Sequence, residues 1–358
     1  MSIKFDRKKT RIVDIGGVKI GGDHPIAVQS MCDTDTRNAQ ATIEQIHMLA
    51  EAGCEIVRVA VPDRQAAAAL TEIKKAVSLP LVADIHFDWK LAVAAAKAGV
   101  DKLRINPGNI GGREKICEVV AAAKDHRLPI RVGVNQGSIE KDLLDKYGGP
   151  NPAALVESAL RNVAYLAEFD FHDIVLSLKA SNAAQTIAAY RLVSEKCDFP
   201  LHLGVTEAGP QWPGTIKSAV AFGALLAEGI GDTIRVSLTA PVEEEVRAGW
   251  EILKALGLRQ RGPVLISCPT CGRLEIDLIA LVGEVQKMLE NIKEPITVAV
   301  MGCVVNGPGE VRDADIGIIG GKGVYLLTRK GKIVFRTKEL SEARRVLLEQ
   351  LAEITAAQ

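Results

Sequence analysis

Three cysteines stand in turns that could present thiolates to a single metal centre. Cys268 and Cys271 form the motif SCPTCG directly after a β-rich run, and Cys303 follows a second such run in MGCVVNGPGE. The neighbouring Gly and Pro residues suit tight turns, whose amides can donate hydrogen bonds to sulfur. A CxxC pair with a further cysteine at a matched position after another strand predicts a metal site.

The fourth ligand of such a centre decides which metal is expected. A structural zinc site usually has four Cys or His ligands, and no Cys or His follows Cys303 in the sequence. Glu310, seven residues further on in the same Gly-rich turn, is the candidate for an exchangeable oxygen ligand. Thiolates with one oxygen ligand suit an iron–sulfur cluster with an open iron better than a closed zinc site. Structural zinc and a Cys268–Cys271 disulfide are the alternatives that the residues leave open.

Polar residues also alternate along β-rich runs that should be apolar. Strands of a parallel barrel are covered on both faces, so nearly continuous apolar runs are expected. Here one parity carries Ile, Leu and Val, and the other carries polar or charged residues. The polar parity is therefore predicted to face the barrel lumen and its carboxyl-terminal mouth, where barrel active sites lie. It includes five cations, which are Arg58, Arg104, Arg131, Lys179 and Arg235.

These cations need negative charge nearby, because an unpaired buried charge is very costly. Asp84 and Glu207 are the acidic residues in the pattern, and they are too few to balance the cations. An anionic ligand with more than one charge would supply the difference, and Arg matches phosphate oxygens with paired donors. The loop INPGNIGG (105–112) between a strand and a helix is expected to add backbone donors. The alternative is that some arginines bind loop carboxylates or cap strand ends.

Glu207 and two histidines are further candidates for chemistry. Glu207 closes a β-rich run in GVTEAG. It is either a proton donor or acceptor, or an ion-pair partner of Arg235 or Lys179. His86 and His202 lie on the polar parity of their strands, where each is either a ligand contact or a core histidine.

The elements that must position these residues follow a regular rhythm between residues 26 and 256, in which β-rich runs alternate with stretches of helical period. The expected strands are 26–31, 56–62, 81–87, 102–106, 130–135, 173–179, 201–206 and 233–238. The expected helices are 39–52, 64–78, 88–98, 113–125, 152–168, 183–196, 215–228 and 242–256. Eight such units predict an α/β fold with a closed (β/α)8 TIM barrel. A doubly wound open sheet is the alternative.

Segments outside this repeat predict a second, smaller domain. Residues 11–22 are expected to form a hairpin at the bottom of the barrel, within a substrate-binding barrel domain over 1–260. GLRQRGP (257–263) is the expected linker. Residues 264–358 predict an α+β iron–sulfur domain. Its strands are expected at VLIS, ITVAVM, 316–319, 323–328 and 332–336, and its helices at 277–291 and 339–354.

The composition of the 358-residue chain excludes several classes of protein. The 44 basic and 44 acidic residues give zero formal charge, whereas a nucleic-acid or membrane-surface binder would normally be basic. A hydrophobic share of 47% excludes disorder. The sequence has neither a bilayer-length apolar run nor a secretory signal, so we expect a cytoplasmic protein with reduced thiols and neither nucleic-acid nor membrane partners.

Ten short motifs together point to a known family. They are VQSM (28–31), RVAVP (58–62), ADIHF (83–87), LRINPGN (103–109), RVGVNQGS (131–138), SLKAS (177–181), LGVTEAG (203–209), IRVSL (234–238), SCPTCGR (267–273) and MGCVVNGPGE (301–310). The chain resembles, over nearly its whole length, the bacterial hydroxymethylbutenyl diphosphate synthase family, iron–sulfur enzymes of the methylerythritol phosphate route to isoprenoids. Cys32 departs from the family pattern, which has Thr after QSM. The long inserted domain of the plant-type enzymes is also absent.

The resemblance implies an oxidoreductase that reductively opens the ring of 2-C-methyl-D-erythritol 2,4-cyclodiphosphate and removes water, which gives (E)-4-hydroxy-3-methylbut-2-enyl diphosphate. Electrons from flavodoxin or ferredoxin would pass through a [4Fe–4S] cluster. The implied cluster ligands are Cys268, Cys271, Cys303 and Glu310. The implied diphosphate contacts are Arg58, Arg104, Arg131, Lys179 and Ser237, with Asn135 nearby. Glu207 would be the acid that serves the leaving hydroxyl.

The resemblance further implies a head-to-tail homodimer, in which one subunit's cluster domain caps the other's barrel. The sequence has no GxGxxG motif after a strand, so a nicotinamide cofactor is not expected. The alternative function is a redox-inert TIM-barrel transferase or lyase that acts on a phosphorylated substrate and has a structural zinc domain.

Overall fold

The computed structural model describes residues 5–290, 292–303, 307–321 and 323–356. The chain divides into two compact units between Arg259 and Gln260. The first unit is built around an eight-stranded parallel sheet. Its strands are β3 (Ala27–Met31), β4 (Ile56–Ala60), β5 (Leu81–Asp84), β6 (Lys102–Ile105), β7 (Ile130–Asn135), β8 (Ile174–Lys179), β9 (His202–Leu203) and β10 (Thr233–Ile234).

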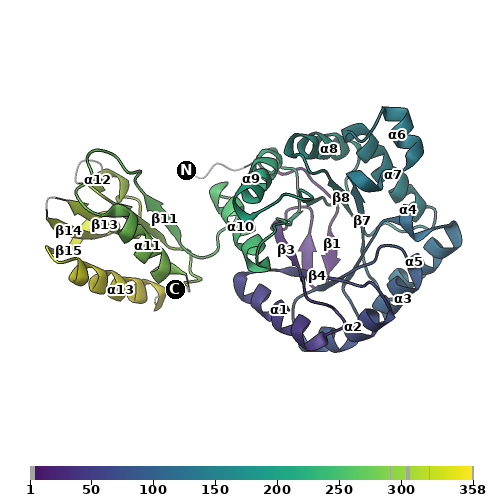
Figure 1. Cartoon of the computed structure of the whole chain (residues 1–358), viewed down its shortest axis with the longest axis horizontal. Helices are drawn as coiled ribbons and strands as arrows, with labels where there is room; N and C mark the ends of the chain where they lie inside the picture. The colour runs from purple at the N-terminus through teal and green to yellow at the C-terminus, as the bar shows by residue number, and fades with distance from the viewer. Residues whose placement is uncertain (1–4, 291, 304–306, 322, 357–358) are drawn as a thin grey trace. The chain divides into compact units, whose positions relative to one another are not determined.

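The strand order shows that this sheet is a barrel. Neighbours run β8-β7-β6-β5-β4-β3-β10-β9, and a parallel bridge between Leu176 and Leu201 joins the two ends of the series. Helices surround the strands, as Figure 1 shows. They are α1 (Ala39–Ala52), α2 (Arg64–Ala76), α3 (Trp89–Lys97), α4 (Pro107–Ile110), α5 (Arg113–Asp125), α6 (Lys141–Tyr147), α7 (Pro152–Ala167), α8 (Ala183–Lys196), α9 (Gln211–Ala227) and α10 (Val242–Ala255). The predicted (β/α)8 barrel is confirmed, and the open-sheet alternative is wrong.

Local sequence signals explain where the helices begin and end. Asp63 and Asn182 accept hydrogen bonds from the first-turn amides of α2 and α8, as N-cap residues do. Gly53 ends α1 in the left-handed conformation that glycine adopts at little cost. Within the described part of the chain, none of the helices combines the length and apolarity needed to cross a bilayer.

Several boundaries differ from the sequence prediction, most clearly those of β9, β10 and α9. β9 and β10 stop at Leu203 and Ile234, whereas strands were expected to run to 206 and 238. Ladder pairing ends early because loop hydrogen bonds replace it: the Thr206 amide donates to the Ala180 carbonyl. Helix α9 starts at Gln211 rather than 215, since Pro213 is tolerated in a first helical turn, where its missing N–H is not needed.

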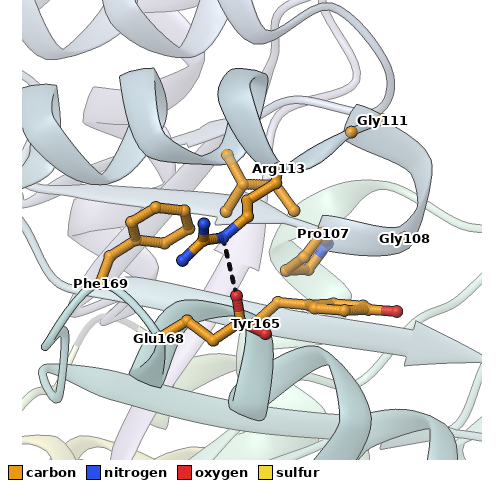
Figure 2. Close-up of a pocket in the computed structure, with 9 residues that line it drawn as sticks. Pro107, Gly108, Gly111, Arg113, Tyr165, Glu168 and Phe169 are labelled. Carbon is orange, nitrogen blue, oxygen red and sulfur yellow. Dashed lines mark hydrogen bonds and ion pairs between the residues drawn. The ribbon is translucent and has the colours of Figure 1, made fainter.

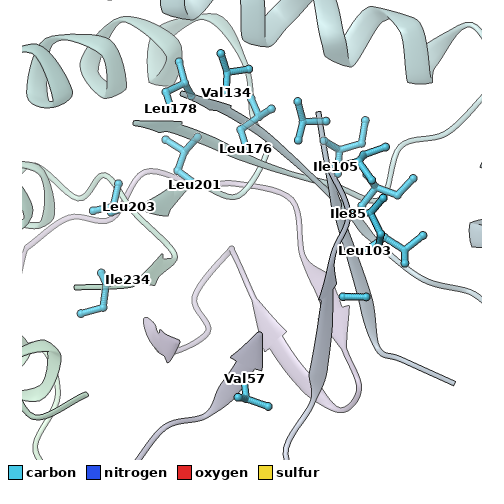
Figure 3. Packing of buried hydrophobic residues seen from close by; sticks show 14 of the residues in the cluster. Val57, Ile85, Leu103, Ile105, Val134, Leu176, Leu178, Leu201, Leu203 and Ile234 are labelled. Carbon is cyan, nitrogen blue, oxygen red and sulfur yellow. The ribbon is translucent and has the colours of Figure 1, made fainter. Parts of the chain in front are cut away.

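The two faces of the barrel strands enter different apolar clusters. Figure 3 shows side chains such as Val57, Leu103 and Leu176 in the cluster formed between strands and helices. The other parity contributes Ile56, Val82 and Val175 to a separate cluster. This second cluster includes Val13, Ile15 and Ile20 from a hairpin of β1 (Val13–Ile15) and β2 (Val18–Ile20). The hairpin therefore packs against the lumenal parity of the strands.

The second unit is a five-stranded mixed sheet with two long helices. Its elements are β11 (Val264–Ser267), α11 (Leu278–Leu289), β12 (Thr297–Met301), α12 (Gly307–Glu310), β13 (Ile316–Gly321), β14 (Val324–Arg329), β15 (Lys332–Thr337) and α13 (Leu340–Ala356). β11, β12 and β13 are parallel, whereas β14 and β15 complete the sheet in antiparallel pairs. The parallel register of β11 and β12 places the carboxyl ends of both strands at one edge of the sheet.

Candidate functional site

Asp84 anchors two of the predicted lumenal arginines. Its Oδ1 lies 2.8 Å from Nη1 of Arg104, and its Oδ2 lies 3.6 Å from Nε of Arg58. Burial acts to raise the pKa of Asp84, but Arg58, a hydrogen bond from His86 and Arg104 outweigh it and hold this pKa well below its ordinary range. Burial lowers the pKa of Arg58 to about 10, so its guanidinium stays protonated at neutral pH.

Glu245 on α10 is the partner of Arg235. The Arg235 Nη2 lies 3.1 Å from Oε2 of Glu245 in a largely buried ion pair. The sequence analysis named Glu207 as a possible ion-pair partner of Arg235. In the structure, Glu245 is the carboxylate that pairs with Arg235. Sequence reasoning missed Glu245 because it stands in an acidic run at the start of a helix, where exposed carboxylates are usual.

Three further buried cations form no ion pair with any carboxylate in the described residues. They are Arg131, Lys179 and Lys102. Nε and Nη2 of Arg131 are buried without a hydrogen-bond partner in the described part of the chain. Burial, together with Arg58 and other cations, lowers the pKa of Lys179 well below its ordinary value. The lumen therefore carries more positive than negative side chains, as the alternation predicted.

Lys102 was not among the predicted lumenal cations. It shares the parity of Arg104 and is fully buried, and its Nζ lies 3.4 Å from Oε1 of Gln29. Burial, Arg131 and Arg58 lower its pKa well below the ordinary lysine value. The alternation along the strand could have indicated Lys102. It was missed because a lysine at the first residue of a strand is usually exposed to solvent.

Two glycines on the lumenal parity make room for these side chains. A Cβ at Gly133 would lie 2.7 Å from Nε of Arg104 and 3.3 Å from Nη1 of Arg131. A Cβ at Gly204 would lie 2.8 Å from Nζ of Lys179. A side chain at either position would therefore push Arg104 or Lys179 out of its present place.

The other predicted site residues of the barrel lie where strands end. Glu207 is exposed, has a left-handed φ of 53° and accepts no hydrogen bond from the described residues. Ser237 is half-buried in the segment after β10. Asn135 ends β7, also half-buried, and its backbone amide donates to Oγ of Ser138 at 3.0 Å. Glu207 forms no ion pair with Arg235 or Lys179, so that alternative for its role does not hold in this structure.

The histidines and Cys32 have different environments. His202 is fully buried, with its Nδ1 2.8 Å from Oγ1 of Thr233 and its Nε2 unpaired in the described structure. Burial lowers its pKa well below the ordinary range, so it is a neutral core histidine. The half-exposed His86 ring lies 3.3 Å from Nη1 of Arg104.

Cys32 is a buried thiol. Burial, Cys54 and Asp33 raise the pKa of Cys32 to about 12, so Cys32 is a neutral thiol.

The loop INPGNIGG does not offer the amide of Gly108 to an anion. This N–H donates to Oδ1 of Asn162 at 2.7 Å and to Oδ1 of Asn106 at 3.2 Å. The expectation of an anion-binding nest is thus wrong at this amide, since side chains from α7 and from the end of β6 already occupy it.

A shallow pocket lies beside this loop, away from the predicted site residues. Its walls include Tyr165, Phe169 and the Arg113–Glu168 ion pair, whose Nε–Oε2 distance is 3.0 Å (Figure 2). None of the predicted diphosphate-binding residues lines it. The pocket therefore belongs to the helix side of the barrel wall rather than to the lumenal cations.

In the second unit, the cysteine motifs follow β11 and β12. The amide of Gly302 donates to Sγ of Cys268 at 3.4 Å, which brings the two strand-end turns together. Cys303 is buried, Cys271 is exposed and Glu310 is exposed at the end of α12. Hydrogen bonds from the backbone and side chain of Arg273 lower the pKa of the Cys271 thiol. Residues 304–306 of the second motif lie outside the described residues.

The donor chemistry of these three cysteines fits an iron–sulfur cluster. Among the described residues, no group of three or more His, Cys, Asp or Glu side chains is close enough to hold a metal ion. The thiols of Cys268, Cys271 and Cys303 are nevertheless all free, and soft thiolates on turns with an amide donor to sulfur are what such clusters use.

The fold and the two groups of residues define the class. This is a TIM-barrel protein with a cation-rich lumen and a separate domain that carries strand-end thiols. The chain belongs to the GcpE family: the model of the GcpE TIM-barrel domain matches residues 10–250, and that of the GcpE protein C-terminal domain matches residues 264–353.

Curated relatives are similar over almost their whole length. A protein of Maridesulfovibrio salexigens is 59% identical over 334 residues, which cover 93% of each chain. One of Symbiobacterium thermophilum is 57% identical over 356 residues, which cover 99% of this chain and 96% of the relative. Both are named 4-hydroxy-3-methylbut-2-en-1-yl diphosphate synthase (flavodoxin).

A solved structure supports the barrel fold alone. Dihydropteroate synthase from Stenotrophomonas maltophilia is 12% identical to this chain, with a TM-score of 0.51. The match covers 69% of this chain and 97% of that one. At this identity, the similarity concerns the fold and says nothing about the reaction.

Proposed function

We propose that this chain catalyses the reductive ring opening and dehydration of 2-C-methyl-D-erythritol 2,4-cyclodiphosphate to (E)-4-hydroxy-3-methylbut-2-enyl diphosphate. Family membership and the shared name of relatives at 57% and 59% identity support this reaction. The observation that carries the proposal is the surplus of lumenal cations, since Arg131 and Lys179 have no carboxylate partner in the described residues. A cyclic diphosphate supplies the missing negative charge.

The barrel is proposed to bind and orient the diphosphate. Asp84 and Glu245 hold their arginine partners in place before a ligand arrives, so less side-chain freedom is lost on binding. Arg131 keeps two donor nitrogens free for phosphate oxygens. The residues proposed to bind the diphosphate are Arg58, Arg104, Arg131, Asn135, Lys179, Arg235 and Ser237.

Glu207 is proposed as the acid that protonates the leaving hydroxyl. Its carboxylate is exposed after β9 and forms no ion pair within the described structure. A carboxyl group can serve as a general acid when it reaches the leaving oxygen. The left-handed backbone of Glu207 marks it as a residue at which the chain accepts strain.

Cys268, Cys271, Cys303 and Glu310 would hold a [4Fe–4S] cluster. When bound, the cluster supplies one at a time the two electrons that the ring opening consumes. The three cysteines would contribute thiolate ligands, and the Glu310 carboxylate would contribute an exchangeable oxygen ligand. Glu310 is exposed, which suits an exchangeable ligand.

The proposed electron donor is flavodoxin, in agreement with the name of the relatives, with ferredoxin as the other candidate. The proposed assembly is a cytoplasmic head-to-tail homodimer, in which the cluster domain of one subunit meets the barrel mouth of the other. An exposed apolar stripe on α9 supports self-association: Trp212 is 77% exposed, and Ile216 and Val220 follow it at four-residue spacing.

Anaerobic reconstitution tests the proposed function. The purified protein is loaded with iron and sulfide, supplied with cyclodiphosphate and a low-potential reductant, and the product is identified by mass spectrometry. We expect a brown protein with about four irons per chain that turns over only with reductant. A colourless zinc protein that turns over a phosphorylated substrate without reductant would instead establish the redox-inert transferase or lyase.

A further inference from the structure

Glu245 is a buried carboxylate at the start of α10, with only 4% of its surface exposed. Its Oε2 accepts hydrogen bonds from Oγ of Ser30 at 2.9 Å and Nε of Arg235 at 3.2 Å. Its Oε1 accepts from Nη2 of Arg235 at 3.2 Å and from the amide of Leu238 at 3.0 Å. Both oxygens are therefore fully used, which is the condition under which a buried charge is tolerated.

These contacts fix the guanidinium of Arg235 in two ways. Paired donors to two carboxylate oxygens restrict rotation of the guanidinium plane. The bond from Ser30 ties the same carboxylate to β3, the strand that neighbours β10 in the barrel. Arg235 consequently enters the lumen with one edge already paired and with its orientation set by α10 and β3 together.

The Leu238 amide extends the influence of Glu245 to a second loop. The amide of Thr239 donates to the carbonyl of Gly209 at 3.0 Å, and Thr239 also forms a parallel bridge with Pro210. The segment 235–239 thus supports the segment 206–210, which carries Glu207. One buried carboxylate therefore holds the backbone that presents Arg235, Ser237 and, through one more contact, Glu207.

We propose that Glu245 is a positioning residue of the diphosphate site, which acts through Arg235 and the segment 235–239 and does not touch the substrate. This inference rests on the proposed function and adds a residue outside the set assigned above. Neutralising Glu245 frees Arg235 to rotate and leaves one more unpaired cation in the lumen. Anion binding weakens because the donor array is no longer arranged in advance.

The test compares Glu245→Gln with Glu243→Gln in the reconstituted enzyme. Glu243 is a matched control: it lies in the same first turn of α10, loses the same charge and forms no ion pair in the described residues. We expect Glu245→Gln to raise KM for the cyclodiphosphate about tenfold. We expect kcat to change by less than about threefold, because the side-chain amide oxygen can still accept the hydrogen bond from Leu238 that supports the Glu207 segment. Glu243→Gln is expected to match the wild type in both.

A double-mutant cycle with Arg235→Met separates positioning from general destabilisation. If Glu245 acts through Arg235, Glu245→Gln has little further effect on KM in the Arg235→Met background. An additive loss, or an unchanged KM in the folded single variant, overturns the proposal. Thermal unfolding of each variant establishes that the comparison is made on folded protein.

Inorganic diphosphate provides a readout that does not depend on turnover. Its Kd, measured by calorimetry, is expected to weaken about tenfold in Glu245→Gln and to stay unchanged in Glu243→Gln. If the wild type fails to convert the cyclodiphosphate yet shows this difference, the proposed reaction is wrong and the positioning role stands. If turnover is normal and the difference is absent, the positioning role is wrong.

Discussion

Nη1 of Arg104 lies 2.8 Å from Oδ1 of Asp84, on the neighbouring strand of the barrel. The same carboxylate has Nε of Arg58 3.6 Å from its other oxygen, so one buried anion serves two cations. Arg131, which pairs with Arg104 in strand register, has no such partner in the described residues. The lumen thus combines cations paired with carboxylates and cations that have no such partner in the described residues.

Asp84→Asn is expected to lower the free energy of unfolding and to weaken anion binding. Removing one member of a buried ion pair leaves uncompensated charge, which costs about 3 kcal/mol or more. Two arginines lose their anchor, so KM for the cyclodiphosphate also rises. Urea unfolding and steady-state kinetics measure the two effects. The exposed Asp125→Asn on α5 is the control, and equal stability of the two variants would contradict the anchoring role.

Gly133→Ala is expected to disturb the arginine pair without touching the backbone conformation. The added Cβ would lie 2.7 Å from Nε of Arg104, so the guanidinium must move, and overpacking of this kind costs about 1–3 kcal/mol. We expect a higher KM for the cyclodiphosphate. Gly137→Ala, where a Cβ would meet nothing within 4 Å, is the matched control. Identical KM values for the two variants would show that the arginines have room to spare.

Lys102→Met is expected to stabilise the fold in a pH-dependent manner. Burial, Arg131 and Arg58 lower the pKa of Lys102. Between this lowered pKa and the unfolded value of about 10.4, the unfolded chain binds more protons at Lys102 than the folded chain does. The contribution of Lys102 to the free energy of unfolding therefore rises with pH, by up to about 1.4 kcal/mol per pH unit.

Lys102→Met lacks this pH-dependent contribution. The free energy of unfolding of the variant therefore exceeds that of the wild type most at low pH, and the difference shrinks as the pH rises. Urea unfolding of both proteins from about pH 6 to about pH 9 measures the difference. Lys97→Met on α3, where the lysine is exposed, controls for loss of a charge. A stability difference that stays constant across this range would mean that Lys102 does not titrate on unfolding.

Cys271→Ser is expected to abolish cluster assembly and activity together. A hydroxyl is a poor ligand for iron in such clusters, where thiolates are used. Iron analysis and visible absorbance after anaerobic reconstitution measure the loss. Cys117→Ser, on the exposed face of α5, should retain its iron. Full iron content in Cys271→Ser would remove this cysteine from the ligand set.

Glu207→Gln is expected to lower kcat by about 10²–10⁴-fold while substrate binding stays close to that of the wild type. The amide keeps the size of the side chain but cannot supply the proton that the leaving hydroxyl needs. Because Glu207 is exposed and unpaired in the described structure, the change should leave stability nearly unaltered. An unaltered kcat with normal binding would exclude the acid role.

The sequence predicted the barrel and its polar lumen because both leave periodic signals. Alternation along the strands separates Arg58 and Arg104 from Val57 and Leu103, and the two sets do enter different surroundings. Helices α1, α5 and α8 have their predicted bounds, since N-cap residues, glycines or changes of period mark their ends.

Relations between distant residues were not predictable in this way. The pairing of Glu245 with Arg235 and Ser30 depends on where α10 crosses the barrel, and no local pattern encodes that crossing. The same reason explains why the amide of Gly108 was expected to be free, although Asn162 from α7 binds it. The cysteine spacing predicted ligand identities, whereas their positions depend on turns that no periodicity describes.

The β1–β2 hairpin limits where a ligand can enter and leave the barrel lumen. Ile15 and Ile20 pack against Ile56, Val82 and Val175, so the hairpin closes the lumen at that end of the barrel. A ligand of the lumen is therefore expected to enter and to leave at the opposite, carboxyl-terminal end of the strands.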